Sequence, residues 1–247
     1  MPSGHANHIE ARPIPDLSGL TLAERLRVLA GDAANAVFTT SLGIEDQVLT
    51  AALVEAAPQV RIATLQTGRL FDETLALIEE TERRYGIAIE RFRPDPDKLA
   101  AYVGRYDLNG FYESVEARHA CCGVRKLEPL SRALKGADLW ITGLRRQQSN
   151  ARAVVPFTEH DTERGLLKAN PLADWSIDDV RRYVADRDVP VNPLHARGYP
   201  SIGCEPCTRA IKPGEDERAG RWWWENDQKR ECGLHVPDSR PAASAFQ

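Results

Sequence analysis

A chain of 247 residues, of which 42% are hydrophobic and 28% charged, can bury a full core as one large domain or two small ones. Its net charge of -4 argues against a broad nucleic-acid-binding surface, which needs an excess of Lys and Arg on one face. We find no apolar run suited to a signal peptide or a membrane span, so we expect a cytoplasmic protein that binds neither nucleic acid nor membrane.

The first part of the chain alternates helix and strand patterns. Thr21 and Glu24 form a capping box, which predicts a helix that runs to about Gly31. The pattern then predicts strands over 36–40, 60–65, 87–92 and 139–142, with helices over 47–55 and 72–85. Such alternation with short connections predicts an α/β fold, in which a parallel sheet is flanked by helices. Ligands of such folds bind beyond the carboxyl ends of the strands.

The remainder of the chain has less regular patterns. Residues 96–134 are predicted to be mainly helical, and Ser176 with Asp179 caps a later helix. The last residues have the composition of a loose tail. We therefore read residues 1–224 as a single α/β nucleotide-binding domain and residues 225–247 as a mobile C-terminal segment.

Two loops of the predicted sheet have features of an anion site. The loop from Ser41 to Asp46 joins a strand to a helix and contains Gly43, which places backbone N–H groups and a helix N-terminus around one point. The same glycine also fits a purely structural turn. Arg145 and Arg146 follow the strand 139–142 and could fork onto phosphate or sulfate oxygens, with a solvated surface charge run as the alternative.

Four of the five cysteines occur in two tight pairs, Cys121 with Cys122 and Cys204 with Cys207. In a chain without a secretory signal, this favours metal ligation over disulfides. The second pair has zinc-site spacing, but adjacent cysteines chelate one tetrahedral ion poorly, whereas a 4Fe-4S cluster offers a separate iron to each thiolate. We favour the iron–sulfur cluster over a zinc knuckle or buried free thiols.

The fifth cysteine, Cys232, lies near the end of the chain, three residues before His235. An exposed thiol near a histidine and arginines has a larger thiolate fraction, and the thiolate is the attacking species. Most lone cysteines are inert, but a tail thiol contributes nothing to a core, which favours a chemical role here. With the other four cysteines committed to metal, the chain has no resolving thiol, so the reductant must be another molecule.

Four motifs now point to a family: Cys-Cys-Gly-Val-Arg-Lys, Gly-Cys-Glu-Pro-Cys-Thr-Arg, Gly-Arg-Trp-Trp-Trp-Glu and Glu-Cys-Gly-Leu-His. From about Phe38 to His235 the chain resembles the assimilatory adenylyl-sulfate reductases, within the larger adenylyl-sulfate and phosphoadenylyl-sulfate reductase family. The resemblance implies a Rossmann-like fold of the adenine nucleotide alpha hydrolase type with a mobile C-terminal tail. It also implies a 4Fe-4S cluster on the four paired cysteines.

The resemblance implies a nucleophilic mechanism as well. The Cys232 thiolate would attack the sulfonate sulfur of adenylyl sulfate and expel AMP, and thioredoxin would then cleave the enzyme thiosulfonate to release sulfite. Further residues receive roles by position in the family's motifs. They are Ser41, Gly43, Glu45 and Asp46 in a phosphate-facing loop, Lys126 between cluster and sulfate, Gly143, Arg145, Arg146 and Arg152 along the nucleotide, and Arg218, Arg221 and His235 closing over it.

The sequence departs from the family's wider pattern at two points. The loop that contains Gly43 has one glycine where related ATP pyrophosphatases have two, so we do not expect ATP cleavage. Gln66 stands where many relatives have aspartate, so no role of that carboxylate is carried over. We also expect a homo-oligomer, whose size the sequence does not give.

Three alternatives stay open at this point. The substrate could be phosphoadenylyl sulfate, or both sulfonucleotides, because the association of the four cysteines with adenylyl sulfate is empirical. An iron–sulfur tRNA thiolase would need a two-glycine loop and a basic RNA-binding surface, and neither is evident. A redox- or zinc-responsive binding protein would leave Cys232 and the grouped arginines without a joint purpose.

Overall fold

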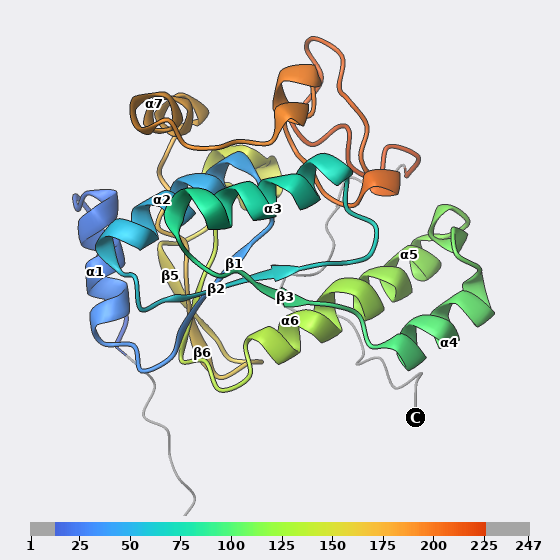
Figure 1. Ribbon diagram of the computed structural model, residues 1–247, viewed down its shortest axis with the longest axis horizontal. Helices are drawn as coiled ribbons and strands as arrows, with labels where there is room; N and C mark the ends of the chain where they lie inside the picture. Colours follow the sequence, from blue (N-terminus) through green and yellow to red (C-terminus); the bar gives the residue numbers. More distant parts are fainter. Residues whose placement is uncertain (1–12, 226–247) are drawn as a thin grey trace, which may run out of the picture.

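The computed structural model describes residues 13–225 and has a central six-stranded sheet with helices on both faces (Figure 1). The strand order is β3-β2-β1-β4-β6-β5, and β5 alone runs antiparallel to its neighbour among these strands. The predicted α/β fold with a parallel sheet is therefore confirmed. The strands are β1 (Ala36–Thr40), β2 (Arg61–Leu65), β3 (Glu90–Phe92), β4 (Leu139–Ile141), β5 (Thr158–Asp161) and β6 (Leu166–Ala169).

The helices begin and end at local signals that the sequence contains. Thr21 and Glu24 form the expected capping box, and Ser176 forms another with Asp179. Gly86 ends a helix in the left-handed conformation, with φ of 64°, which glycine adopts without strain. The helices are α1 (Leu22–Gly31), α2 (Ile44–Ala56), α3 (Asp72–Tyr85), α4 (Pro96–Tyr106), α5 (Val115–Cys122), α6 (Glu128–Ala133) and α7 (Ile177–Arg187), and a π-helical turn joins α5 to α6.

The sheet separates two apolar layers. Successive side chains of a strand point to opposite faces, so Val37 and Phe38 of β1 belong to different clusters. Phe38 packs in the larger cluster, with α1, α2, α3 and α7, whereas Val37 packs with Trp140 and Leu130 of α6. Figure 1 shows the same division, with α4, α5 and α6 on the side opposite α2 and α3.

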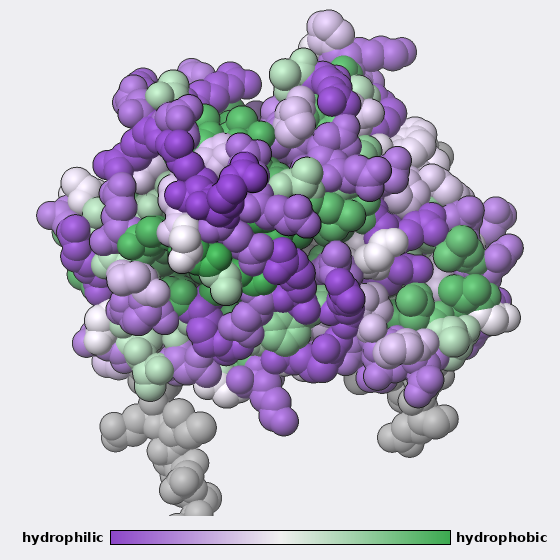
Figure 2. Space-filling model, in the orientation of Figure 1, coloured by the Kyte–Doolittle hydropathy of each residue, from purple (hydrophilic) through white to green (hydrophobic). Residues whose placement is uncertain are grey.

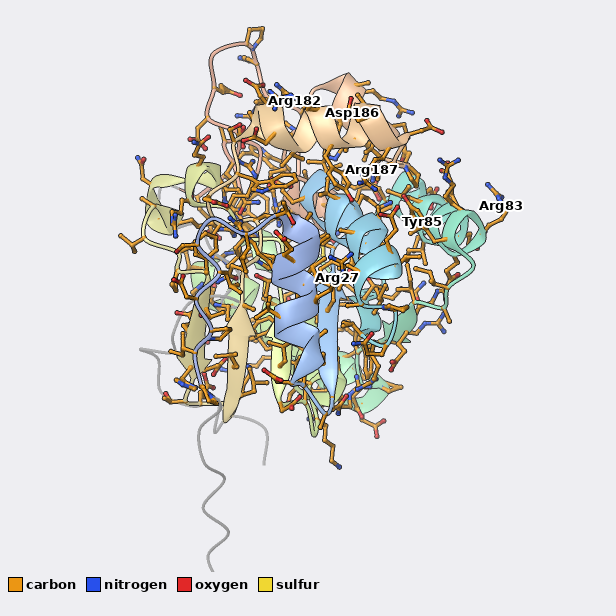
Figure 3. The ribbon with its side chains drawn as sticks, turned by 90° about the vertical axis from the view of Figure 1, so that its left-hand side faces the viewer. Arg27, Arg83, Tyr85, Arg182, Asp186 and Arg187 are labelled. Carbon is orange, nitrogen blue, oxygen red and sulfur yellow. The ribbon has the colours of Figure 1, made fainter. Side chains whose placement is uncertain are left out.

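Helix α7 is fixed against the first layer by one buried side chain and an ion pair. Val180 is fully buried, and the Arg187 guanidinium lies 2.8 Å from a Glu55 carboxylate oxygen at the end of α2. Figure 3 looks onto this side of the molecule and labels Arg187 of α7 and Tyr85 of α3. The chain leaves α7 toward the segment 200–222, so this contact helps to set where that segment lies.

The elements differ from the expected ones mainly at their ends. Helix α2 starts at Ile44, not at residue 47, because Gly43 serves as its N-cap and the acidic Glu45 and Asp46 occupy its first turn. Strand β3 begins at Glu90, three residues later than expected. The hairpin of β5 and β6 lies where the sequence pattern indicates a polar turn between extended segments over residues 159–167, and each of its strands has four residues.

Most of the visible surface is polar, and apolar side chains gather over the end of the molecule formed by α4 and α5 (Figure 2). Leu108 and Val115 are exposed there. Within residues 13–225, no helix has both the length and the apolar composition needed to cross a membrane.

Candidate functional site

A cavity of about 200 Å³ lies at the carboxyl ends of β1, β2 and β4. The parallel strands place these ends at one edge of the sheet, where ligands bind in such folds. The segment 200–222 forms its other wall. The cavity brings together most of the residues that received substrate-binding roles, namely Ser41, Gly43, Glu45, Asp46, Lys126, Gly143, Arg152, Arg218 and Arg221.

The loop before α2 is closed by one carboxylate. Both the backbone N–H and the hydroxyl of Ser41 donate to Asp46 Oδ2 at 2.6 Å, and the Ser41 hydroxyl oxygen accepts from the Gly43 N–H at 3.4 Å. Burial raises the pKa of Asp46 from its usual 3.8 to about 6, although the hydrogen bonds from Ser41 oppose the rise. At neutral pH the Asp46 carboxylate therefore orders this loop while it lines the cavity.

Gly143 allows the loop after β4 to approach α2. A Cβ atom at this position would lie 2.2 Å from Asp46 Oδ1 and 3.4 Å from Glu45 Cβ. The first distance is far below van der Waals contact, so any side chain here would displace the Asp46 carboxylate. Gly143 is thus required by packing against the cavity wall.

Glu45, which is partly buried in this wall, forms an ion pair with the buried Arg145 behind it. Arg145 is fully buried, and its Nε donates to Glu45 Oε1 at 2.9 Å. Gln148 Nε2 donates to the same oxygen at 3.0 Å, and Gln148 Oε1 accepts from Arg152 Nη1 at 2.6 Å. The pair therefore holds Gln148, which in turn holds Arg152 at the cavity surface.

Arg146 lies apart from this network. It donates from Nε to the Val155 carbonyl oxygen at 2.8 Å, and its guanidinium lies 5.1 Å from the centre of the Phe157 ring. These contacts hold the loop that contains Arg152. The structure thus places Arg145 and Arg146 among the groups that support the cavity wall.

Four cations line the cavity: Lys126, Arg152, Arg218 and Arg221. Arg221 is buried, and its Nη1 donates to the Ile202 carbonyl oxygen at 3.3 Å. A Cβ at Gly203 would lie 2.2 Å from Arg221 Nη2, so the guanidinium packs directly on that backbone. Convergent cations in a partly enclosed cavity favour a small ligand with several anionic oxygens.

The four cysteines line a second cavity that adjoins the first. Cys121, Cys122, Cys204 and Cys207 are all buried and free of disulfides. Lys126, Cys204 and Trp222 line both cavities. The cavity lined by cations and the thiol cavity therefore share a wall.

The pKa values of these thiols move in different directions: burial raises the pKa of Cys121, and it raises that of Cys207 to about 12, whereas the pKa of Cys204 is lowered. Burial alone would raise the pKa of the Cys204 thiol, but Lys126, the Thr67 hydroxyl and Arg221 together bring it below the ordinary value. The Thr67 hydroxyl oxygen lies 3.3 Å from Cys204 Sγ. Thiolates are the form that binds metal, so four buried thiols beside cations have the chemistry of a thiolate-liganded metal centre.

The thiolates are not arranged around a single point. No three His, Cys, Asp or Glu side chains in the described part of the chain are placed to hold one metal ion. Four thiolates that bind separate irons of a cluster do not have to meet at one point.

Sequence reasoning missed several residues of the first cavity. Thr39, Thr64 and Thr142 line it at the ends of three strands, beside Trp140. Their position at strand ends was a usable signal, because such ends meet at one edge of the sheet. Gln148 had no such signal, since its role depends on an ion pair formed by distant residues.

Cys232 and His235 lie outside the described residues 13–225, as does nearly all of the C-terminal segment that begins at residue 225. Their expected roles in nucleophilic attack and closure, and the division of the chain at residue 225, stay predictions.

Residues 35–210 match the family described as the phosphoadenosine phosphosulfate reductase domain. The chain is 66% identical over 231 residues to the adenosine 5′-phosphosulfate reductase of Sinorhizobium fredii, which covers 93% of this chain and 92% of the relative. It is 60% identical over 205 residues to the reductase of the same name from Allochromatium vinosum, with 83% and 80% covered.

The fold is similar to that of a solved structure, the phosphoadenylyl-sulfate reductase from Candida auris in a phosphate complex. The TM-score is 0.67 and the identity 24%, over 78% of this chain and 91% of that chain. This similarity concerns the fold.

Proposed function

The chain belongs to the phosphoadenosine phosphosulfate reductase domain family, and from this premise we propose that it reduces adenylyl sulfate (adenosine 5′-phosphosulfate) to sulfite and AMP in assimilatory sulfate reduction. Relatives that share most of its length are named for this substrate. The single observation that carries the proposal is the shared wall: Lys126 and Cys204 line both the cavity with four cations and the cavity with four thiols.

The first cavity suits the substrate's phosphosulfate group. Lys126, Arg152, Arg218 and Arg221 supply positive charge around one space. They offset the charge of the bound anion and the charge that develops on the departing phosphate of AMP. The strand-end position of the cavity suits the nucleotide part, as in other open α/β sheets.

The second cavity is the proposed site of a 4Fe-4S cluster on Cys121, Cys122, Cys204 and Cys207. The donor set fits, because four buried thiols line one space together with Arg125 and other cations that offset thiolate charge. When bound, the cluster would supply a redox-capable iron–sulfur centre next to the anion site. The chain's own residues carry the steps that follow.

The chemical step belongs to Cys232. Its thiolate attacks the sulfur of the sulfonate group, forming an S–S bond while the bond from that sulfur to the phosphate oxygen of AMP breaks. The electron pair leaves with AMP, and Cys232 becomes a thiosulfonate. No electron from outside the two reactants is needed at this stage.

Release of sulfite requires an external dithiol. A thioredoxin thiolate attacks Cys232 Sγ and expels sulfite, and its second thiol then resolves the mixed disulfide, so that Cys232 is reduced and thioredoxin is oxidised. The chain has five cysteines, of which four line the thiol cavity, so Cys232 has no resolving partner of its own. Reduced cysteines of this kind are kept in the cytoplasm, which is the location we propose.

Cys232→Ser tests the proposal. We expect this variant to lose sulfite release from adenylyl sulfate and thioredoxin while it keeps the iron content of the unaltered protein, because the two sets of cysteines have different tasks. Normal turnover by the variant would eliminate the proposed nucleophile.

The predicted homo-oligomer is checked on the same preparation by light scattering, which would give a single-chain mass if that prediction is wrong.

A further inference from the structure

The side chain of Glu225, the last residue that the structure describes, forms a buried ion pair with Arg118. Its Oε1 lies 2.5 Å from Nε of Arg118 on α5, and the two side chains are 5% and 1% exposed. The Arg118 guanidinium lines the thiol cavity three residues before Cys121. The pair thus ties the start of residues 226–247 to the helix that contains Cys121 and Cys122.

Stability alone does not account for such a pair. Removing two charges from water costs about as much as their attraction returns, so apolar residues of similar size are often equally stabilising. A buried ion pair also fixes its two side chains in one relative position, because the charges are satisfied in that position only. The arrangement fixed here is the position of Glu225 relative to the thiol cavity.

Trp222 connects the same pair to the anion cavity. Its ring centre lies 4.8 Å from the Arg118 guanidinium and 4.7 Å from that of Arg221. Trp222 has a φ of 44°, a strained value for a residue with a side chain, and it is almost fully buried. Strain at this position is maintained only if the surrounding contacts determine it, and the Arg118–Glu225 pair is one of them.

Two buried polar atoms beside the pair have spare hydrogen-bonding capacity. Trp222 Nε1 and Glu225 Oε2 have no partner among residues 13–225.

We propose that Arg118 is a positioning residue for the nucleophile: through Glu225 it anchors the root of the C-terminal segment beside the two cavities. The inference rests on the proposed function in that Cys232 is the attacking thiol. Cys232 is seven residues beyond Glu225, so a fixed root keeps it within about 25 Å of that point. Its thiol is then held at a high effective concentration near the anion cavity.

Loss of the anchor has a calculable minimum effect. The next fixed residue toward the N-terminus is Trp222, which is almost fully buried and whose backbone N–H donates to the Cys207 carbonyl oxygen at 3.2 Å. Release to Trp222 lengthens the tether to Cys232 from seven residues to ten, which lowers the effective concentration about 1.7-fold. The released segment also no longer leaves the fold in one fixed direction, which lowers the effective concentration of the Cys232 thiol further.

The test compares Arg118→Met, Glu225→Gln and the double variant Arg118→Met/Glu225→Leu with the unaltered protein. The double variant replaces the pair by apolar side chains and so keeps the chain folded if either single variant does not. Glu116→Gln is the matched control, because it breaks the exposed pair of α5 with Arg105.

Two readouts are measured. The first is the rate of chymotrypsin cleavage after Trp223 and Trp224, followed by mass spectrometry, which needs no catalytic reaction. We expect it to rise about tenfold in Arg118→Met and in Glu225→Gln, because each leaves one buried partner unpaired and local opening of the root becomes easier, and to stay unchanged in the control. The second is single-turnover transfer of the sulfonate to Cys232, which we expect to slow at least about 1.7-fold while iron content and AMP affinity stay constant.

Unchanged cleavage in the two single variants, or equal acceleration in Glu116→Gln, would overturn the anchor. So would a slower transfer in Arg118→Met that Glu225→Gln does not share, because Arg118 would then act on the thiol cavity by its charge. If the unaltered protein itself acquires no sulfonate on Cys232, the proposed function fails, and the cleavage rates alone decide on the anchor.

Discussion

The carboxylate of Asp46 gives the sharpest test of the cavity's electrostatics. Asp46 is 8% exposed and accepts two hydrogen bonds from Ser41, and burial raises its pKa from 3.8 to about 6. Asp46→Asn keeps the shape and an accepting oxygen but removes the ionisation. The two proteins should therefore differ in how their stability depends on pH.

The sign and size of this difference in pH dependence follow from proton linkage. Because the pKa of Asp46 is higher in the folded chain, the stability it contributes is fully present below its unfolded pKa and is lost as pH rises through about 6. The difference between 3.8 and about 6 corresponds to about 3 kcal/mol in total. Roughly half of that loss falls between pH 5 and pH 8.

The assay is urea unfolding of both proteins at pH 5 and pH 8 under anaerobic conditions. We expect the stability of Asp46→Asn relative to the unaltered protein to increase by about 1.4 kcal/mol from pH 5 to pH 8. Comparison with the variant cancels the other groups that titrate in this range.

Asp179 supplies a matched control. It accepts from the backbone N–H and hydroxyl of Ser176, as Asp46 does from Ser41, but on the exposed start of α7. The Ser176 hydroxyl and N–H lower the pKa of Asp179, so its contribution is present at high pH and is lost as pH falls. That loss falls below about pH 4, so the stability difference for Asp179→Asn should hardly change between pH 5 and pH 8. A stability difference for Asp46→Asn that is equally constant over this range would show that Asp46 does not titrate there.

Three further substitutions test the two cavities. Gly143→Ala should destabilise the chain by about 1–3 kcal/mol in urea unfolding and weaken AMP binding, because its Cβ displaces Asp46. Gly203→Ala should lower the affinity for adenylyl sulfate about tenfold in equilibrium binding, because its Cβ displaces the Arg221 guanidinium and a charge-assisted contact is lost. Cys122→Ser should lose iron and activity together in metal analysis and sulfite assays.

The two glycine substitutions share one control. Gly104 lies in α4 with open space around it, so Gly104→Ala should stabilise the chain by about 0.5–1 kcal/mol and leave binding unchanged. Normal binding by Gly203→Ala would show that Arg221 adjusts without loss. Zinc in place of iron, in Cys122→Ser or in the unaltered protein, would contradict the proposed cluster.

The local signals of the sequence were sufficient for the elements of the fold. The capping boxes at Thr21 and Ser176 and the left-handed Gly86 all depend on residues within one helical turn, and the structure contains each of them. The strand order was not predictable in this way, because pairing of β4 between β1 and β6 depends on contacts between distant segments.

The candidate site was predictable where residues follow strands and less so where they act through others. Ser41 and Arg152 line the cavity, as the family's motifs imply. The same motifs do not distinguish Arg145, which the structure buries against Glu45, from an arginine that faces the cavity. Nor do they indicate Arg118, whose partner Glu225 is 107 residues away in the sequence.

We propose that Cys232 accepts the sulfonate beside a separate set of metal-binding cysteines. The most direct measurement incubates the protein with adenylyl sulfate labelled with radioactive sulfur, without thioredoxin, and locates the label by peptide mass spectrometry. We expect about one sulfonate per chain on the peptide that contains Cys232, and its release as sulfite when reduced thioredoxin is added. A chain that stays unlabelled, or that carries the label on Cys121, Cys122, Cys204 or Cys207, would contradict it.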